Sequence, residues 1–479
     1  MSEEITPEQP NSSQPQQQPQ PQSGRTQRVD TTTGSLMWKM LVLSWPIVVT
    51  YLLQSAVSVA DIYMVGKLGA REVAAVGIAR SVTFILVSLS FAVAMGVRVL
   101  VAQYSGSGQM QMADRAVKQG LIAATVLSLC FISPVGILAS RWIMVLLGAT
   151  PEVVGYGVLY LQLLFGGIVF MILSFVMTGA LQGAGDTITP LILLLVTNAV
   201  NIAVNYVFIF GWGPFPQLGV TGAAIGTLTS RFLVTIAGLW IFSSGKYAIS
   251  VNWVGRWHIR WEFWKKIFYL GTPASVQSIT RNLGFMAIIR VLSMTSAGML
   301  AISAFTIAGQ IRMVTGMVGL ALMAGATTAV GQNVGADNYG RASRSAWMSA
   351  GIAAALSTVA ATIYAITGPT LVRMFNDNPE VITVGAEALL ILAFSEPFLT
   401  AGMSLSGSLR GAGDTMSPLW VSICTVTILG PLASYILAIP LGMDTVGVWL
   451  GFDIGIVARM GLLAWVFLRG KWKEVEMLE

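Results

Sequence analysis

The sequence has 479 residues and a formal net charge of +6, yet only 10 % of its residues are charged and 55 % are hydrophobic. A soluble protein of this size needs far more charge to cover its surface, so the composition excludes a soluble globular protein and places most of the chain in a lipid bilayer. The basic residues are scattered between hydrophobic segments, which argues against nucleic-acid binding.

Metal and redox chemistry find little support in the sequence. The single histidine, His258, lies in a basic segment, and the two cysteines, Cys130 and Cys424, lie in separate hydrophobic segments. These residues do not have the spacing of a metal site or a disulfide framework, so we expect no cofactor.

The amino-terminal segment differs from the rest of the chain. Residues 1–38 are rich in Gln and Pro and poor in large apolar residues, so they cannot bury a core. We expect a disordered cytoplasmic tail.

Beyond this tail, twelve hydrophobic segments are each long enough to cross a hydrocarbon core of about 30 Å, which needs roughly 20 apolar residues. They predict an all-α integral membrane protein. The segments lie near 41–66, 74–102, 117–140, 154–180, 188–211, 219–243, 266–293, 300–330, 346–367, 381–408, 417–440 and 446–468.

Lys and Arg residues predict the orientation of these segments. If the amino terminus is cytoplasmic, most basic residues between segments fall in cytoplasmic loops, and few fall outside. We therefore expect a multi-pass protein of the cell membrane with both termini cytoplasmic, including a short carboxy-terminal tail at 469–479. The basic, Trp-rich connection at 244–265 predicts an amphipathic segment on the inner membrane surface.

Two similar halves follow one another along the chain. Residues 181–191 read L-Q-G-A-G-D-T-I-T-P-L, and residues 409–419 read L-R-G-A-G-D-T-M-S-P-L. Further pairs at almost the same spacing are A-Q-Y-S-G with G-Q-N-V-G and W-P-I-V-V with T-P-A-S-V. This repeat predicts six-helix halves at 39–243 and 266–468, related by a pseudo-twofold axis along the membrane normal, with substrate bound between them.

Each repeated G-A-G-D-T block allows two interpretations. The glycines can end one span in left-handed geometry, and Asp186 and Asp414 can then cap the next span. Alternatively, these two carboxylates contact the other half and hold one conformational state.

Polar residues inside the first-half spans are candidates for a cation or proton site. Asp61 is the one carboxylate within these spans, and Asn198, Asn201 and Asn205 follow one another at spacings that share a helical face. Their amide oxygens can bind Na⁺ or simply join helices by hydrogen bonds. Thr227 is a weaker candidate, because membrane hydroxyls often bond to their own backbone.

The second half does not repeat this polar set. It carries five charged residues within or near spans, and charges in lipid should pair. They are Arg281, Arg312, Glu396, Asp453 and Arg459. Arg281 could pair with Glu396 or Asp453, as a structural salt bridge or as part of a substrate cavity.

Prolines occupy matching positions in the first span of each half. Pro46 and Pro273 each remove a backbone hydrogen bond and permit a kink. Bending at Pro46 would couple ion occupancy at Asp61 to the shape of a cavity.

The repeated block, the opening W-P…A-D-I-Y-M-V-G-K-L-G and the segment N-I-A-V-N-Y-V-F-I-F-G resemble the multidrug and toxic compound extrusion (MATE) family over residues 40–465. The resemblance implies an antiporter that expels cationic, amphipathic compounds in exchange for Na⁺ or H⁺. It implies that Asp61, Asn201 and Asn205 form the coupling site, with Na⁺ possible there. Asn205, where some members carry Asp, is the NorM-like pattern, but the second-half acids of NorM-like members are not clearly matched.

Other functions are open at this level. A flippase for lipid-linked oligosaccharides has similar six-helix halves, and a non-transporting scaffold or receptor is a further alternative. No catalytic motif supports a membrane enzyme. We predict a monomer that contacts membrane lipid and small molecules, with no nucleic-acid partner.

Overall fold

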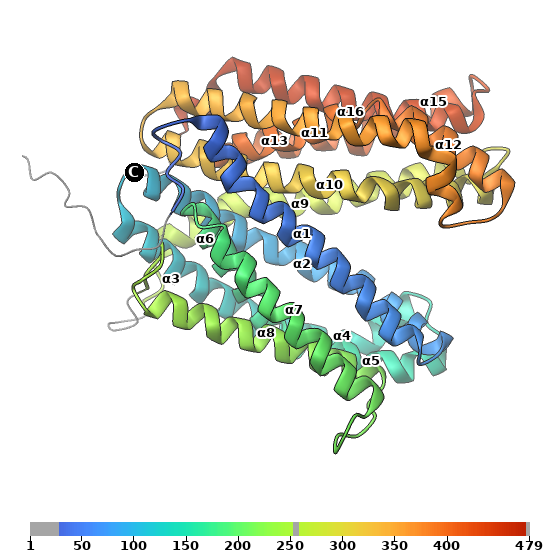
Figure 1. Cartoon of the computed structure of the whole chain (residues 1–479), viewed down its shortest axis with the longest axis horizontal. Helices are drawn as coiled ribbons and strands as arrows, with labels where there is room; N and C mark the ends of the chain where they lie inside the picture. The colour runs from blue at the N-terminus through green and yellow to red at the C-terminus, as the bar shows by residue number, and fades with distance from the viewer. Residues whose placement is uncertain (1–27, 252–257, 476–479) are drawn as a thin grey trace, which may run out of the picture.

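The computed structural model describes residues 28–251 and 258–475 and arranges them as two helical bundles that follow one another in sequence (Figure 1). The described residues form no strand. The first bundle contains α1 (Leu36–Gly66), α2 (Ala70–Gly106), α3 (Met110–Val126), η1 (Leu127–Ile132), α4 (Ser133–Leu146), α5 (Pro151–Gly166), α6 (Ile168–Gly183), α7 (Ile188–Phe210) and α8 (Val220–Ser243). The second contains α9 (Trp261–Leu292), α10 (Gly298–Gly335), α11 (Tyr339–Arg373), α12 (Pro379–Ala393), α13 (Glu396–Gly411), α14 (Met416–Ser422), η2 (Ile423–Leu429), α15 (Gly430–Ala438), α16 (Asp444–Arg469) and η3 (Lys471–Glu474).

Membrane crossing follows from the length and composition of these helices. Among the described residues, nine helices are long and apolar enough to cross a bilayer, or up to eleven segments if each of two bent pairs counts as one. The sequence-based count of twelve is reached only by including α9, a 32-residue helix that carries Glu262, Lys265, Lys266, Arg281 and Arg290. α9 is long enough to cross a bilayer but is not among the helices that are apolar enough to be counted.

The bent pairs occupy equivalent places in the two halves. α5 and α6 meet at an angle of 47° beside Gly167, and α12 and α13 meet at 52° beside Ser395. These positions lie 228 residues apart, as the repeated blocks do. The duplication seen in the sequence therefore extends to a break in the fourth span of each half.

The two bundles come into close backbone contact where α2 and α10 end. A Cβ atom added to Gly106 would lie 1.9 Å from the carbonyl oxygen of Gln332, and one added to Gly335 would lie 1.9 Å from that of Gln103. Only glycine permits such an approach of two backbones. From this end the bundles diverge (Figure 1). We call the contact between α2 and α10 at these two glycines the seam.

Residues 28–35 pack across the seam. Val29 N donates to Gly185 O in the first half at 3.1 Å, while Thr31 N donates to Gln332 Oε1 in the second half at 3.0 Å and Arg341 Nε donates to Thr31 O at 2.7 Å. The predicted tail boundary at residue 38 is therefore wrong for these residues, since Thr31 is buried and α1 begins at Leu36. Residues 1–27 lie outside the described residues.

The connection between the halves also differs from its prediction as an amphipathic surface segment. Val251 N donates to Phe242 O at 2.9 Å, and Ala248 and Ile249 are buried. The first part of the connection therefore folds back against the first half. Residues 252–257 lie outside the described residues, and α9 starts at Trp261, before the predicted boundary at 265.

The repeated G-A-G-D-T blocks form the same turn twice. Gly185 and Gly413 have φ values of +89° and +98°, which glycine adopts without strain. Asp186 Oδ1 accepts from Thr189 N at 3.0 Å, and Asp414 Oδ1 accepts from Ser417 N at 3.0 Å. Each aspartate thus binds an amide in the first turn of α7 or α14, as expected if these residues cap the next span.

The seam predicts which glycines tolerate a methyl group. Gly335→Ala should force α2 and α10 apart at a cost of about 1–3 kcal/mol, as overpacking usually does, and should lower the thermal unfolding midpoint in detergent by several degrees. Gly351→Ala is the matched control, because a Cβ there meets nothing within 4 Å. Equal midpoints for the two variants would contradict the close approach described here.

Candidate functional site

The predicted coupling residues meet between α1, α7 and α8. Asn205 Nδ2 in α7 donates to Asp61 Oδ1 in α1 at 2.8 Å and lies 3.2 Å from Asn201 Oδ1, one turn away. Asn201 Nδ2 lies 3.4 Å from Ser230 Oγ in α8. Three helices of the first half are thus joined through one carboxylate and two amides.

The remaining two candidates lie near this site without joining it. Asn198 is buried on the same helix, and its Nδ2 atom has no partner among the described residues. Thr227 Oγ1 donates to Ala223 O of its own helix at 3.0 Å, which is the backbone role that the sequence left open. Its side chain also lines a cavity, described below.

Close packing of α8 on α7 holds Asn205 in place. A Cβ atom added to Gly226 would lie 1.9 Å from Asn205 Oδ1. The glycine therefore provides the space that the amide occupies beside Asp61. It lies one residue before Thr227 and sets the distance between the two helices at this site.

The residues present fit a small hard cation. Carboxylate and amide oxygens are ligands that such ions accept, and Asn205 Oδ1 is buried without a hydrogen-bond partner among the described residues. No group of three His, Cys, Asp or Glu side chains suited to a metal ion occurs in the described part of the chain. One carboxylate with amide oxygens suits a monovalent cation, or a proton on Asp61, better than a transition metal.

Two adjoining cavities lie near this site, one within the first half and one between the halves. The larger, about 400 Å³, is lined by described residues of the first half, including Phe91, Arg98, Phe175 and Arg231. The smaller, about 220 Å³, is lined mainly by the second half. Tyr51, Val87 and Phe91 line both, so the two spaces share a wall of α1 and α2 residues.

The larger cavity contains two arginines that sequence reasoning missed. Arg98 in α2 donates to Gln182 Oε1 in α6. Arg231 in α8 lies 5.9 Å from the ring centre of Phe175 and close enough to Asp61 for their charges to interact. The signal was available, because both are charges inside hydrophobic segments, as Asp61 is.

The comparisons with known proteins agree with this arrangement. A family model described as MatE matches residues 46–207 and again 273–436, once in each half. The chain belongs to the MatE family. It is a multidrug and toxic compound extrusion (MATE) transporter by family and not an enzyme, as the sequence motifs predicted.

Individual relatives cover nearly the whole chain. The chain is 30 % identical over 93 % of its length to a probable multidrug resistance protein NorM of Bradyrhizobium diazoefficiens, of which 95 % is covered, and 29 % identical over 90 % to a NorM of Rhizobium meliloti, of which 92 % is covered. A solved structure described as the outward-facing conformation of a multidrug resistance MATE family transporter has a TM-score of 0.86 at 22 % identity, over 94 % of this chain and 100 % of that one. This likeness shows the fold.

The second-half charges of this MatE protein pair differently from the options that the sequence offered. Arg312 in α10 forms an ion pair with Glu396 at the start of α13, and both side chains are buried. Asp453 of α16 lies close enough to both for their charges to interact. Arg281 pairs with neither acid among the described residues, and lines the smaller cavity instead.

The Arg312–Glu396 pair lines neither of the two central cavities, which favours a structural role. Removing one partner should leave a buried charge unpaired, so Glu396→Gln should destabilise the protein by about 3–5 kcal/mol. The double variant Arg312→Met/Glu396→Leu should recover most of the thermal unfolding midpoint. Recovery of stability without recovery of transport would contradict the structural role.

The packing of Gly226 gives a test of the coupling site that changes no charged residue. Gly226→Ala should displace the Asn205 amide from Asp61 and weaken cation binding roughly tenfold, about the effect of one lost charge-assisted hydrogen bond. The measurement is the concentration of Na⁺ or H⁺ needed for half-maximal transport. Gly155→Ala in the same half is the control, because a Cβ there meets nothing within 4 Å; an equal ion dependence in both variants would sink this assignment.

Proposed function

We propose that this MatE protein is a secondary active transporter that exports small amphipathic molecules by alternating access in exchange for Na⁺ or H⁺. The observation that carries the proposal is the Asp61–Asn205 contact at 2.8 Å, a cation-competent site beside a first-half cavity that adjoins a second cavity between the two repeated halves. Transporters built from parallel repeats bind substrate between the halves and rock one half against the other.

The seam supports one state of this cycle. The halves meet where both described termini lie: residues 28–35 contact α10 and α11, and Trp472 of η3 stacks on Phe467 with ring centres 4.9 Å apart, beside Tyr339. The distribution of Lys and Arg predicts that this end is cytoplasmic. With that orientation in a cell membrane, the structure is closed to the cytoplasm and faces outward.

Helix α1 offers a connection between the ion site and the seam. Its first part packs on α10, with Met40 and Leu43 against Ala329, and its other end carries Asp61. Pro46 lies between these two contacts, where a missing backbone hydrogen bond eases bending. We assign Pro46 to the hinge that couples ion occupancy to the seam, and Pro273, its counterpart in α9, to the matching hinge of the second half.

The family resemblance predicts cationic substrates, and two features are compatible with them. Phe91, Phe175 and Tyr51 present aromatic rings to the larger cavity, and such rings attract organic cations. Met95 and Met171 add adaptable apolar surface. We expect the monomer to be the transporting unit, because each chain contains both halves.

The decisive variant is Asp61→Asn. In proteoliposomes, ethidium and the organic anion 2-naphthoate are followed under an imposed Na⁺ gradient and, separately, an imposed pH gradient. Wild type should move at least one probe against its gradient, and Asp61→Asn should lose about tenfold or more of that rate, because the amide cannot neutralise a cation. The gradient that drives transport names the ion.

Glu387→Gln is the control for loss of a carboxylate in general, since Glu387 lies in α12, outside the lining of both central cavities. Equal transport by wild type and Asp61→Asn would remove Asp61 from coupling. Absence of gradient-driven movement of either probe in wild type would overturn the exchange itself.

A further inference from the structure

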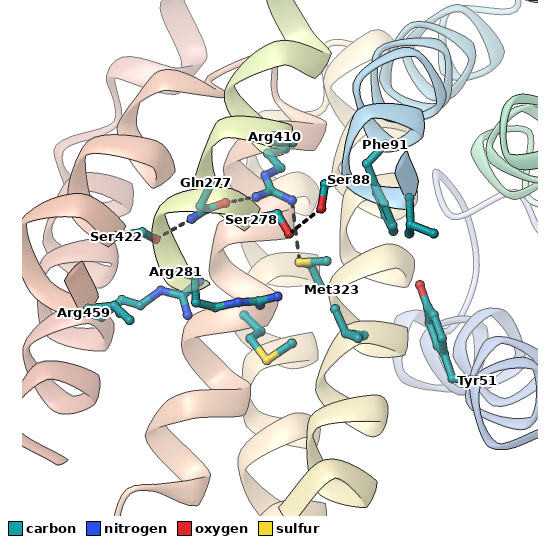
Figure 2. A pocket seen from close by; sticks show the side chains of 15 residues that line it. Tyr51, Ser88, Phe91, Gln277, Ser278, Arg281, Met323, Arg410, Ser422 and Arg459 are labelled. Carbon is teal, nitrogen blue, oxygen red and sulfur yellow. Dashed lines mark hydrogen bonds between the residues drawn. The ribbon is translucent and has the colours of Figure 1, made fainter. Parts of the chain in front are cut away.

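Three arginines from three helices of the second half line the smaller cavity. They are Arg281 of α9, Arg410 of α13 and Arg459 of α16. Figure 2 shows their side chains together on one side of the cavity, with Tyr51 and Phe91 of the first half on the other. No Asp or Glu is among the described residues that line this cavity or the larger one.

The guanidinium groups retain hydrogen-bonding capacity. Arg410 donates to Gln277 Oε1, and Gln277 Nε2 is itself held by Pro418 O at 2.8 Å. The Nε atoms of Arg410 and Arg459 are buried and have no partner among the described residues. Arg281 has no hydrogen bond or ion pair there either, and is exposed where it lines the cavity.

Carboxylates of the second half do not neutralise this cluster. Glu396 forms an ion pair with Arg312, and Asp453 interacts electrostatically with that pair. Asp453 and Arg459 share α16, but six residues place them on well-separated faces of a helix. The charged side chains that act on Arg410 are all arginines, namely Arg459, Arg281 and Arg98.

The position of Arg459 repeats that of Arg231, which lies 228 residues earlier and lines the cavity of the first half. Both cavities thus receive an arginine from the last span of their own half. In the first half that charge faces Asp61, whereas the position 228 residues after Asp61 is Ile289 and 227 after it is Ile288, both apolar. The second-half cluster therefore lacks the acid that its counterpart has.

Gathering like charges at membrane depth without counter-ions is costly, and charges retained there mark functional sites. Arg410 lies in the last turn of α13, where the helix dipole favours a cation. Arg281 and Arg459 have no such structural reason among the described residues. A bound anion would supply the missing counter-charge, and paired guanidinium groups suit carboxylate and phosphate oxygens.

We propose that Arg281, Arg410 and Arg459 bind the carboxylate or phosphate group of an amphipathic organic anion. Phe91, Met323 and Met403 of the same cavity contact its apolar part. The proposal rests on the transport function proposed above and specifies its substrate as anionic, where the family resemblance predicts cations.

The test uses one ring system with opposite charges. Binding of 2-naphthoate and of 2-naphthylmethylammonium is measured by isothermal titration on the full chain in detergent, with no ion gradient. Wild type should bind 2-naphthoate at least about tenfold more tightly, and Arg281→Gln and Arg459→Gln should each lose about tenfold or more of that affinity. Arg290→Gln, which removes an exposed charge from the same helix α9 outside the cavity lining, should bind as wild type does.

Thermal unfolding separates a binding role from a structural one. Removing one of several like charges should keep or raise the unfolding midpoint of Arg459→Gln while its anion affinity falls. Arg281→Gln alters an exposed side chain and should fold normally. Equal affinity for the two naphthyl probes, or unchanged 2-naphthoate affinity in both variants, would overturn the anion site.

Two further experiments complete the test. The first identifies the source of the anion, and the second separates anion binding from transport. In nanodiscs, weaker 2-naphthoate binding with phosphatidylglycerol than with phosphatidylcholine supports the site with a lipid headgroup as a ligand, and equal binding supports it with a soluble anion. In proteoliposomes, ethidium exchange without 2-naphthoate binding overturns the anion site but leaves the exchanger. Binding of 2-naphthoate without gradient-driven movement of either probe leaves the site and overturns the exchanger.

Discussion

The cost of placing charge in a low-dielectric medium governs where this chain can put its few ionisable side chains. Three solutions occur among the described residues. Asp61 accepts a hydrogen bond from Asn205 and faces Arg231; Arg312 and Glu396 neutralise each other away from both central cavities; and Arg281, Arg410 and Arg459 gather where a cavity can admit a ligand. The pattern separates the proposed cation site of the first half from the proposed anion site of the second.

The duplication explains why these solutions are related without being identical. Gln182 and Arg410 occupy the same position of the repeated block. In the first half, Gln182 accepts from Arg98 of α2; in the second, Arg410 supplies the guanidinium itself and donates to Gln277 of α9. Each half therefore contains an arginine–glutamine hydrogen bond, but the arginine lies in α2 in the first half and in α13 in the second. Sequence divergence has thus changed the polarity of a local contact while the helices around it keep their places.

Much of the architecture could be predicted from the sequence, because repeats, hydrophobic length and helix-ending glycines are local signals. The repeated blocks predicted both halves and the turns at Gly185 and Gly413, and the spacing of Asn201 and Asn205 predicted their shared face. Contacts between residues far apart in the sequence could not be predicted from these local signals. Arg312 meets Glu396 over 84 residues, and Thr31 meets Gln332 over 301, so each contact depends on the packing of several helices. Arg281 and Arg459 were visible as charges in predicted spans, whereas Arg410 lies just beyond the predicted segment 381–408. Which arginines share one cavity depends on the fold.

Opposite charges in opposite halves would change the energetics of the proposed exchange. One-for-one exchange of a cationic substrate for a cation moves no net charge, so the membrane potential contributes nothing. A cation entering at Asp61 while an anion leaves from the arginine cluster moves two positive charges inward, and each is driven by about 2.3 kcal/mol per 100 mV. Because ion and substrate would occupy separate sites, direct competition could not couple them. The coupling would have to pass through the two conformations of the halves, to which α1 connects Asp61 at one end and the seam at the other.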